Sequence, residues 1–185
     1  MTAGPIYMGR WRIDVDARPG VPRLAPAAAL ARSVASALDA AGAPAPASVG
    51  LILADDRELA ALNREQMGVD GPTDVLSFPL LPPEAYPVRP GLPREPVRAA
   101  SAAAVSFPLP PRTRPHLGDI VVSVERAAAQ AEAGRGGQTG DVRWSAADEL
   151  RLLVVHGALH LCGWDHADPA EEAAMRAVER QLLGQ

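Results

Sequence analysis

The feature that most constrains this chain is a stretch near its end, residues 150–162, which is apolar on almost every side and yet holds two histidines. Ser145 and Asp148 stand just before it at the spacing of a helix cap, so we predict a helix buried in the core. His156 and His160 are four residues apart, which on a helix places their side chains on the same side, one turn apart. The two imidazoles are therefore expected to converge.

A third histidine follows shortly after this helix. Gly163 is the type of residue that ends a helix in the left-handed conformation, and the turn formed by residues 163–165 can bring His166 back toward His156 and His160. Three neutral ring nitrogens, with water in the fourth position, make an open tetrahedral zinc site. We predict one transition metal ion per chain, with zinc as the first choice and another transition metal as the alternative.

Two other kinds of metal site share part of this pattern. A structural zinc site usually has four protein ligands and favours sulfur, but Cys162 lies roughly 200° around the helix from His160 and is predicted to pack in the core. The metzincin peptidases have the same spacing of histidines and glycine, with a glutamate after the first histidine as general base. Gly157 occupies that position here, which argues against a zinc peptidase.

Three blocks of sequence resemble the motifs of the YbeY family of endoribonucleases. The longest block is residues 155–166, and residues 71–79 and 117–121 resemble two further motifs in the right order. The resemblance covers most of the chain outside residues 81–115. It implies an α+β metal-dependent hydrolase fold with three ligands on one metal, usually zinc. Carried over to this sequence, the ligands are His156, His160 and His166.

The same resemblance implies cleavage of single-stranded RNA. The family is implicated in processing the 3′ end of small-subunit ribosomal RNA and in ribosome quality control. The expected partners are therefore single-stranded or ribosomal RNA, the ribosome and small-subunit assembly factors, and no DNA. Two departures stand out: the proline-rich insertion is longer than expected, and Met67 occupies the position of a family arginine near the site. That substitution removes an expected phosphate contact.

Phosphodiester cleavage needs an activated water and a group that stabilises negative charge on the phosphate oxygens. We assign catalytic roles to four residues: His156, Asp165, Arg64 and Ser77. Arg64 is the candidate substitute for the missing arginine, with a solvated helix face as the alternative. Asp165 is expected to orient a ligand imidazole or act on the water, and otherwise to cap the turn. Ser77 is expected either to touch the substrate or to fill its strand face.

Two other functions remain open at this point. A ribosome-associated assembly factor with the metal as a scaffold would keep its RNA or ribosome association after loss of hydrolysis. A metallohydrolase of another substrate would turn over a small phosphoester or an amide without competition from RNA.

The rest of the chain predicts a single α+β domain over residues 1–185, with a mixed sheet of about four strands and about five helices. Strands are expected over residues 11–15, 49–53, 75–80 and 120–124. Helices are expected over residues 22–41, 55–67, 125–133, 145–162 and 169–183. The metal site then lies on the buried C-terminal helix and the turn that follows it.

Residues 81–115 form a proline-rich insertion with ten of the nineteen prolines, and with five arginines against two glutamates. Neither a central strand nor a helix tolerates such proline density, so we predict an extended, mobile segment. It is either a solvated linker or a contact for an anionic partner.

The overall composition restricts the remaining classes of protein. A net charge of −4 over 185 residues excludes a generally cationic nucleic-acid coat, although a local basic groove remains compatible with it. A single cysteine permits no intrachain disulfide, and no apolar run reaches the ~18 residues of a membrane span. Without the apolar core of a signal peptide at its start, the chain is expected to be cytoplasmic, with no membrane partner.

Overall fold

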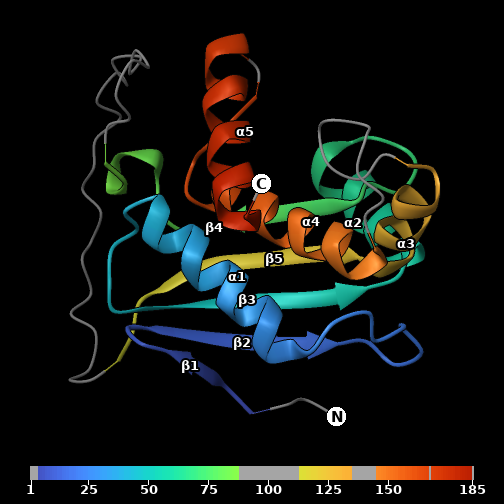
Figure 1. Cartoon of the computed structure of the whole chain (residues 1–185), viewed down its shortest axis with the longest axis horizontal. Coiled ribbons are helices and arrows are strands. Elements are labelled where there is room, and N and C mark those ends of the chain that lie inside the picture. Colours follow the sequence, from blue (N-terminus) through green and yellow to red (C-terminus); the bar gives the residue numbers. More distant parts are fainter. Residues whose placement is uncertain (1–3, 88–112, 135–144, 167, 185) are drawn as a thin grey trace.

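A five-stranded mixed sheet forms the centre of the computed structural model, which describes residues 4–87, 113–134, 145–166 and 168–184 (Figure 1). The strands are β1 (Ile6–Met8), β2 (Trp11–Ala17), β3 (Ala47–Ala54), β4 (Val75–Pro79) and β5 (His116–Ser123). Their order across the sheet is β1-β2-β3-β5-β4. The inner strands β2, β3 and β5 are parallel, while β1 and β4 run antiparallel to their neighbours at the two edges.

The additional strand relative to the sequence-based prediction is β1. It has three residues and pairs with β2 through a tight turn at Gly9 and Arg10, where Gly9 has a φ of 59°. A strand of this length is too short to show an alternating pattern, so it could not be recognised from periodicity. The α+β class itself is confirmed, with five helices around one mixed sheet.

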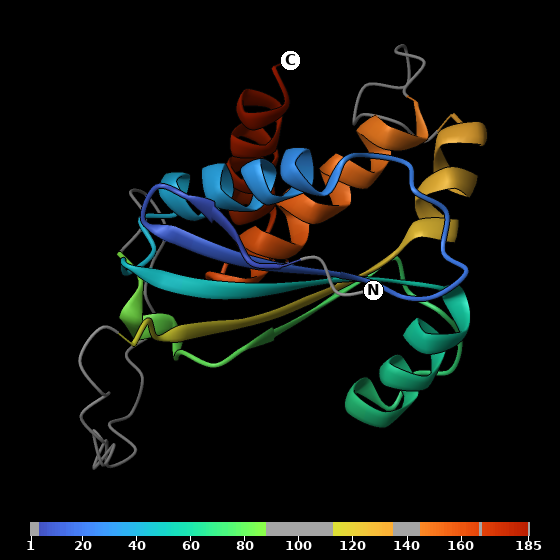
Figure 2. The same cartoon turned by 90° about the horizontal axis from the view of Figure 1, so that it is seen from below.

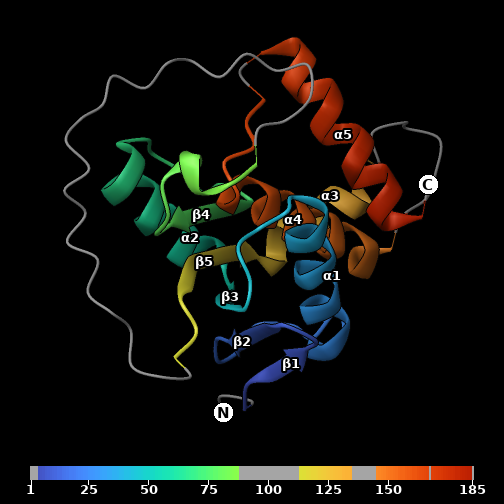
Figure 3. The same ribbon diagram turned by 90° about the vertical axis from the view of Figure 1, so that its left-hand side faces the viewer.

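Two helices cover one face of the sheet, α1 (Ala27–Ala40) and α4 (Ala146–Leu161), and α5 (Pro169–Leu183) packs on these two helices. Figure 2 and Figure 3 show α2 (Asp56–Leu62) on the opposite face. The alternation of side chains along β5 matches this division, because Ile120 packs in the main core while Val121 packs with Leu59 of α2. The fifth helix, α3 (Val124–Glu132), packs against α4.

Several helix boundaries differ from the predicted ones for local reasons. α1 begins at Ala27 instead of residue 22, with Pro26 as its N-cap, because a residue that precedes proline is disfavoured in the helical region. After α2 the chain widens into one π-helical turn, η1 (Asn63–Met67), which ends at Gly68 in the left-handed conformation. The wider turn changes the directions of the side chains from those of an α-helix, and Met67 is 64% exposed.

The beginning of the proline-rich insertion does not follow the prediction of an extended segment. Pro83–Ala85 form one turn of 3₁₀ helix, η2, and Tyr86 is packed in the hydrophobic core. The prediction was therefore wrong for this part. Burial of a large aromatic side chain is strongly favourable, and the neighbouring prolines do not stop the chain from bringing Tyr86 into the core. Residues 88–112, to which the rest of that prediction applies, lie outside the described residues.

The length and hydropathy of the helices show whether any of them could span a membrane. Across the four described segments, no helix is both long enough and apolar enough to cross a lipid bilayer.

Candidate metal centre

The histidine-bearing helix α4 begins with a complete capping box. The Ser145 hydroxyl accepts a hydrogen bond from the Asp148 backbone N–H, and the Asp148 carboxylate accepts one from the Ser145 backbone N–H. From this cap the helix runs across β4 and β5, and most of its residues from Leu150 to Leu161 are buried. The predicted buried helix is confirmed.

Gly157 allows α4 to lie unusually close to the sheet. A Cβ atom built at Gly157 would lie 2.7 Å from Cγ2 of Ile120 and 2.8 Å from Cγ2 of Val75. The carbonyl of Gly157 accepts a hydrogen bond of 2.8 Å from the Ser77 hydroxyl on β4. Any larger side chain at this position would require the Ile120 and Val75 side chains to move, which also disfavours a metzincin-type glutamate on steric grounds.

The C-terminal end of α4 redirects the chain toward the histidines. Gly163 has a φ of 78°, its N–H donates to the His160 carbonyl at 2.8 Å, and the Trp164 N–H donates to the Leu159 carbonyl at 3.1 Å. This left-handed cap satisfies the last carbonyls of the helix and starts the turn that carries His166. Cys162, at the end of the helix, is buried in the core as predicted.

The three histidines lie together at this end of α4. One nitrogen atom from each ring can be chosen so that all three lie within 4.8 Å of one another. The Nε2 atoms of His156 and His160 are 3.0 Å apart, and the ring centroids of His160 and His166 are 5.0 Å apart. Among the described residues, no other group of three or more histidine, cysteine or acidic side chains is arranged to hold a metal ion.

A buried carboxylate on α5 holds the first of these histidines. Nδ1 of His156 lies 2.7 Å from Oε1 of Glu179, which is 2% exposed. With the Nδ1–H donating to the carboxylate, Nε2 of a neutral His156 ring keeps its lone pair for a metal. The sequence reasoning missed Glu179. The signal that could have found it is an acid four residues after Met175, on the face of α5 that packs inward.

The second histidine is held in its neutral form. Burial lowers the pKa of His160 to about 4, and repulsion from His156 and His166 contributes in the same direction. A hydrogen bond with the Trp164 backbone and the charge of Asp165 oppose this shift. His160 is therefore neutral at physiological pH, which is the state in which an imidazole binds a metal ion.

A hollow between the end of α4 and the first turns of α5 gives access to this group. Its lining comes from both helices and from the turn that joins them, and consists of His156, His166, Glu172, Met175, Arg176 and Glu179. Arg176 forms an ion pair with Glu172 one turn earlier on α5. Three clustered imidazoles, two of which line an open space, are the arrangement of a metal site with a free position.

The other predicted site residues lie in three different settings. The Asp165 carboxylate accepts a hydrogen bond of 2.7 Å from the His166 backbone N–H, so it shapes the turn that carries the third histidine. Ser77 bonds to the α4 backbone one residue after His156. Arg64 is exposed on η1, which follows α2 on the opposite face of the sheet (Figure 2), and it is not among the residues that line the hollow.

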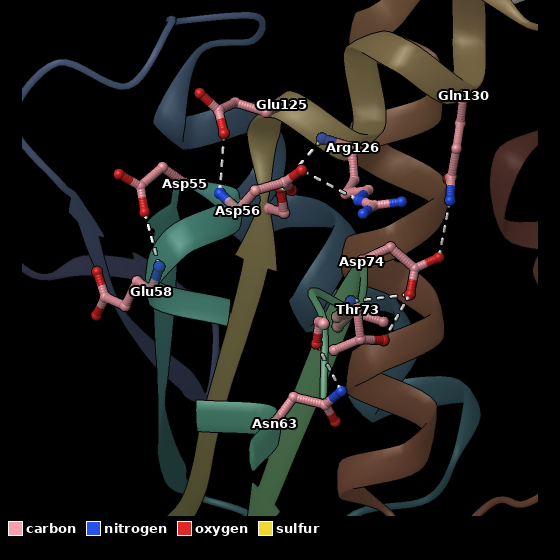
Figure 4. A network of polar contacts seen from close by, with 12 residues as sticks. Asp55, Asp56, Glu58, Asn63, Thr73, Asp74, Glu125, Arg126 and Gln130 are labelled. Atoms are coloured by element: carbon pink, nitrogen blue, oxygen red, sulfur yellow. Dashed lines mark hydrogen bonds and ion pairs between the residues drawn. The ribbon is translucent and has the colours of Figure 1, made fainter. Parts of the chain in front are cut away.

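A separate polar network, also missed from the sequence, ties α2, α3 and the start of β4 together (Figure 4). The Asp74 carboxylate accepts hydrogen bonds from the Val75 backbone N–H at 2.9 Å and from the Gln130 amide at 3.0 Å. The Asp56 carboxylate accepts from the Ser123 hydroxyl at 2.6 Å. The Asp74 bonds fix the start of β4, and the Asp56 bond joins α2 to the end of β5; α4 packs on both of these strands.

The family model and the curated relatives agree on one family. The model of the family described as Endoribonuclease YbeY matches residues 22–185. Endoribonuclease YbeY of Roseiflexus castenholzii is 35% identical over 173 residues, covering 93% of this chain and 91% of that protein. Endoribonuclease YbeY of Salinispora tropica is 43% identical over 148 residues, covering 80% and 79%. A solution structure of a Thermotoga maritima protein covers 94% of this chain and 89% of its own, with 21% identity and a TM-score of 0.48.

Proposed function

Because the chain belongs to the YbeY family of endoribonucleases, we propose that it is a metal-dependent endoribonuclease that cleaves single-stranded RNA. Its proposed task is maturation of the 3′ end of small-subunit ribosomal RNA, together with ribosome quality control. The partners in this proposal are ribosomal RNA, the ribosome and small-subunit assembly factors in the cytoplasm, with no role on DNA or membranes.

The observation that carries the proposal is the group of three imidazole nitrogens within 4.8 Å of one another, two of whose rings, His156 and His166, line an open hollow. This donor set suits zinc or another transition metal, one per chain, with His156, His160 and His166 as ligands. When bound, such an ion supplies Lewis-acid polarisation of the phosphate and activation of water.

The protein's own residues prepare this site. Glu179 fixes the ring orientation of His156, which leaves Nε2 of that ring facing Nε2 of His160 at 3.0 Å. Asp165 holds the turn that carries His166, and Ser77 anchors α4 to β4 beside the first ligand. In the proposal both act by positioning. Direct catalytic roles for Asp165, Ser77 and Arg64 stay predictions.

The test is a nuclease assay on single-stranded and duplex RNA of the same sequence. It compares the wild type, the His156→Ala variant and a metal-stripped sample. We expect the wild type to cleave the single-stranded RNA in preference to the duplex, and both other samples to lose cleavage. RNA or ribosome association without any hydrolysis by the wild type would favour the assembly factor. Turnover of a small phosphoester without competition from RNA would favour a different metallohydrolase.

A further inference from the structure

Cleavage of a phosphodiester needs a positive group beside the phosphate, because negative charge develops on its oxygens in the transition state. Two candidates near in sequence to the family motif do not supply it. Met67 is uncharged, and Arg64, which lies with it on η1, is not among the residues that line the hollow. A protein cation that would add to the charge of the metal ion is therefore to be sought among the residues that surround the hollow.

Arg176 is the arginine that lines this hollow together with His156 and His166. It lies three residues before Glu179 on α5, so the two side chains project from adjacent turns of the same helix face. Since Glu179 contacts the His156 ring, its neighbour Arg176 is placed over the same opening. The Arg176 side chain is 49% exposed, which leaves its guanidinium accessible from solvent.

The charges around the hollow explain why Arg176 matters there. Two carboxylates line it, and an approaching phosphate would be repelled by both. Glu179 is engaged by His156, and Glu172 is neutralised by its ion pair with Arg176. Ion pairs between two partly exposed side chains are weak, so a phosphate can replace Glu172 at little cost. The planar guanidinium then binds two phosphate oxygens at once.

We propose that Arg176 binds a phosphate of the RNA backbone at the histidine site. In the free protein the guanidinium of Arg176 is ion-paired with Glu172, which therefore competes with the phosphate. This inference rests on the proposed function and names the residue that recognises its substrate. Arg176 is a binding residue that contacts the substrate, whereas Glu172 acts through Arg176.

The experiment measures the affinity of the full-length, metal-loaded protein for a fluorescent single-stranded RNA over a range of salt concentrations. The RNA carries phosphorothioate links, which keep the backbone charge and resist cleavage. Arg176→Gln should bind severalfold more weakly, and its plot of log affinity against log salt should be shallower by about 0.7, the value for one phosphate contact on a single strand. Arg176→Lys should retain the salt slope and lose part of the affinity, because it keeps the charge without the fork.

Arg180→Gln is the matched control. Arg180 lies one turn further along α5 and is not among the residues that line the hollow, so its loss should leave both affinity and slope nearly unchanged. Glu172→Gln should bind RNA more tightly than the wild type, and this gain should vanish when Arg176→Gln is also present. Thermal melting of each variant should match the wild type, since both side chains are partly exposed.

An unchanged salt slope in Arg176→Gln would overturn the inference, and so would a gain from Glu172→Gln that persists without Arg176. Because the readout is binding, the result is independent of the cleavage assay. If the wild type cleaves no RNA but Arg176→Gln shows the loss of one phosphate contact, the proposed function is refuted and the phosphate site is retained. If the wild type cleaves RNA and Arg176→Gln binds RNA as the wild type does, the phosphate site is refuted and the proposed function is retained.

Discussion

Nδ1 of His156 and Oε1 of Glu179 lie 2.7 Å apart, although the two residues are 23 positions apart in the sequence and belong to different helices. This contact makes α5 part of the candidate metal centre, because α5 carries the carboxylate that fixes the tautomer of a ligand on α4. The following predictions test what this and neighbouring contacts contribute.

Glu179→Gln should weaken zinc binding by about 10- to 100-fold, the usual effect of removing a carboxylate behind a ligand histidine. The amide keeps the size of the side chain, so the fold should persist. Affinity is measured by competition with a chromophoric chelator. Glu172→Gln is the matched control, since Glu172 lines the same hollow from the same helix but pairs with Arg176. Equal affinity in Glu179→Gln and the wild type would show that the contact does not support metal binding.

Gly157→Ala should destabilise the protein. In an ordinary helix alanine is more favourable than glycine by about 1 kcal/mol. Here the new methyl group would approach Ile120 and Val75 to less than 3 Å, and such overpacking typically costs about 1–3 kcal/mol. The measurement is the free energy of unfolding by urea titration, which should be lower in Gly157→Ala than in the wild type. A more stable variant would mean that α4 can move away from the sheet without loss.

Tyr86 offers a test of how the proline-rich insertion is anchored. Its side chain is 5% exposed in the core, so Tyr86→Ala should cost about 3–5 kcal/mol, as for other large aromatic truncations. Its buried hydroxyl has no hydrogen-bond partner among the described residues, and burial raises the pKa of Tyr86 to about 12. Tyr86→Phe should therefore be neutral or stabilising.

Denaturant unfolding of the two Tyr86 variants checks both expectations. Similar losses in Tyr86→Phe and Tyr86→Ala would show that the hydroxyl is needed and that ring packing is not the main contribution. A deletion within the proline-rich insertion that begins at residue 83 would remove Tyr86 together with the prolines, so it should destabilise the fold.

The burial of Glu149 leads us to predict that the stability of the protein depends on pH. It is 3% exposed, its Oε2 has no hydrogen-bond partner among the described residues, and burial followed by repulsion from Asp74 raises the pKa of its carboxyl. The folded state therefore holds this proton more tightly than the unfolded state. Its stabilising contribution is present below the ordinary glutamate pKa of about 4.3 and is lost as pH rises through the raised value.

Glu149→Gln removes the charge and should therefore melt at a higher temperature than the wild type near neutral pH. The difference should shrink as the pH falls toward about 4. Thermal unfolding across this range is the measurement, with Glu132→Gln as an exposed control on α3 that should show no such trend. A difference that stays constant with pH would contradict the assignment.

The elements that the sequence predicts well are those with local signals. The apolar run around His156, the cap at Ser145 and the left-handed Gly163 are all readable within one short stretch, and together they place the three histidines. The contacts that complete the centre are long-range. Glu179 reaches His156 only because α5 folds back over the end of α4, and no periodicity encodes that docking.

The positions of Arg64 and Met67 in the fold could not be predicted for a different reason. Both were placed by their position relative to a motif, and neither a motif nor a helical period shows on which face of the sheet a helix will pack. The π-helical turn at residues 63–67 shifts the side chains away from the directions of an α-helix. Tyr86 shows the opposite error, because a proline-rich composition concealed one aromatic residue that belongs to the core.

The most direct test of the metal-dependent nuclease is a titration of metal-stripped protein with zinc, followed by the single-turnover rate of cleavage of a single-stranded RNA. We predict that the stripped wild type is inactive and that its rate rises to a plateau at about one zinc ion per chain, as expected for one site with three protein ligands. His160→Ala should stay inactive over the same range. Full-rate cleavage by the stripped wild type, or equal recovery in His160→Ala, would contradict the assignment of the three histidines as the catalytic metal centre.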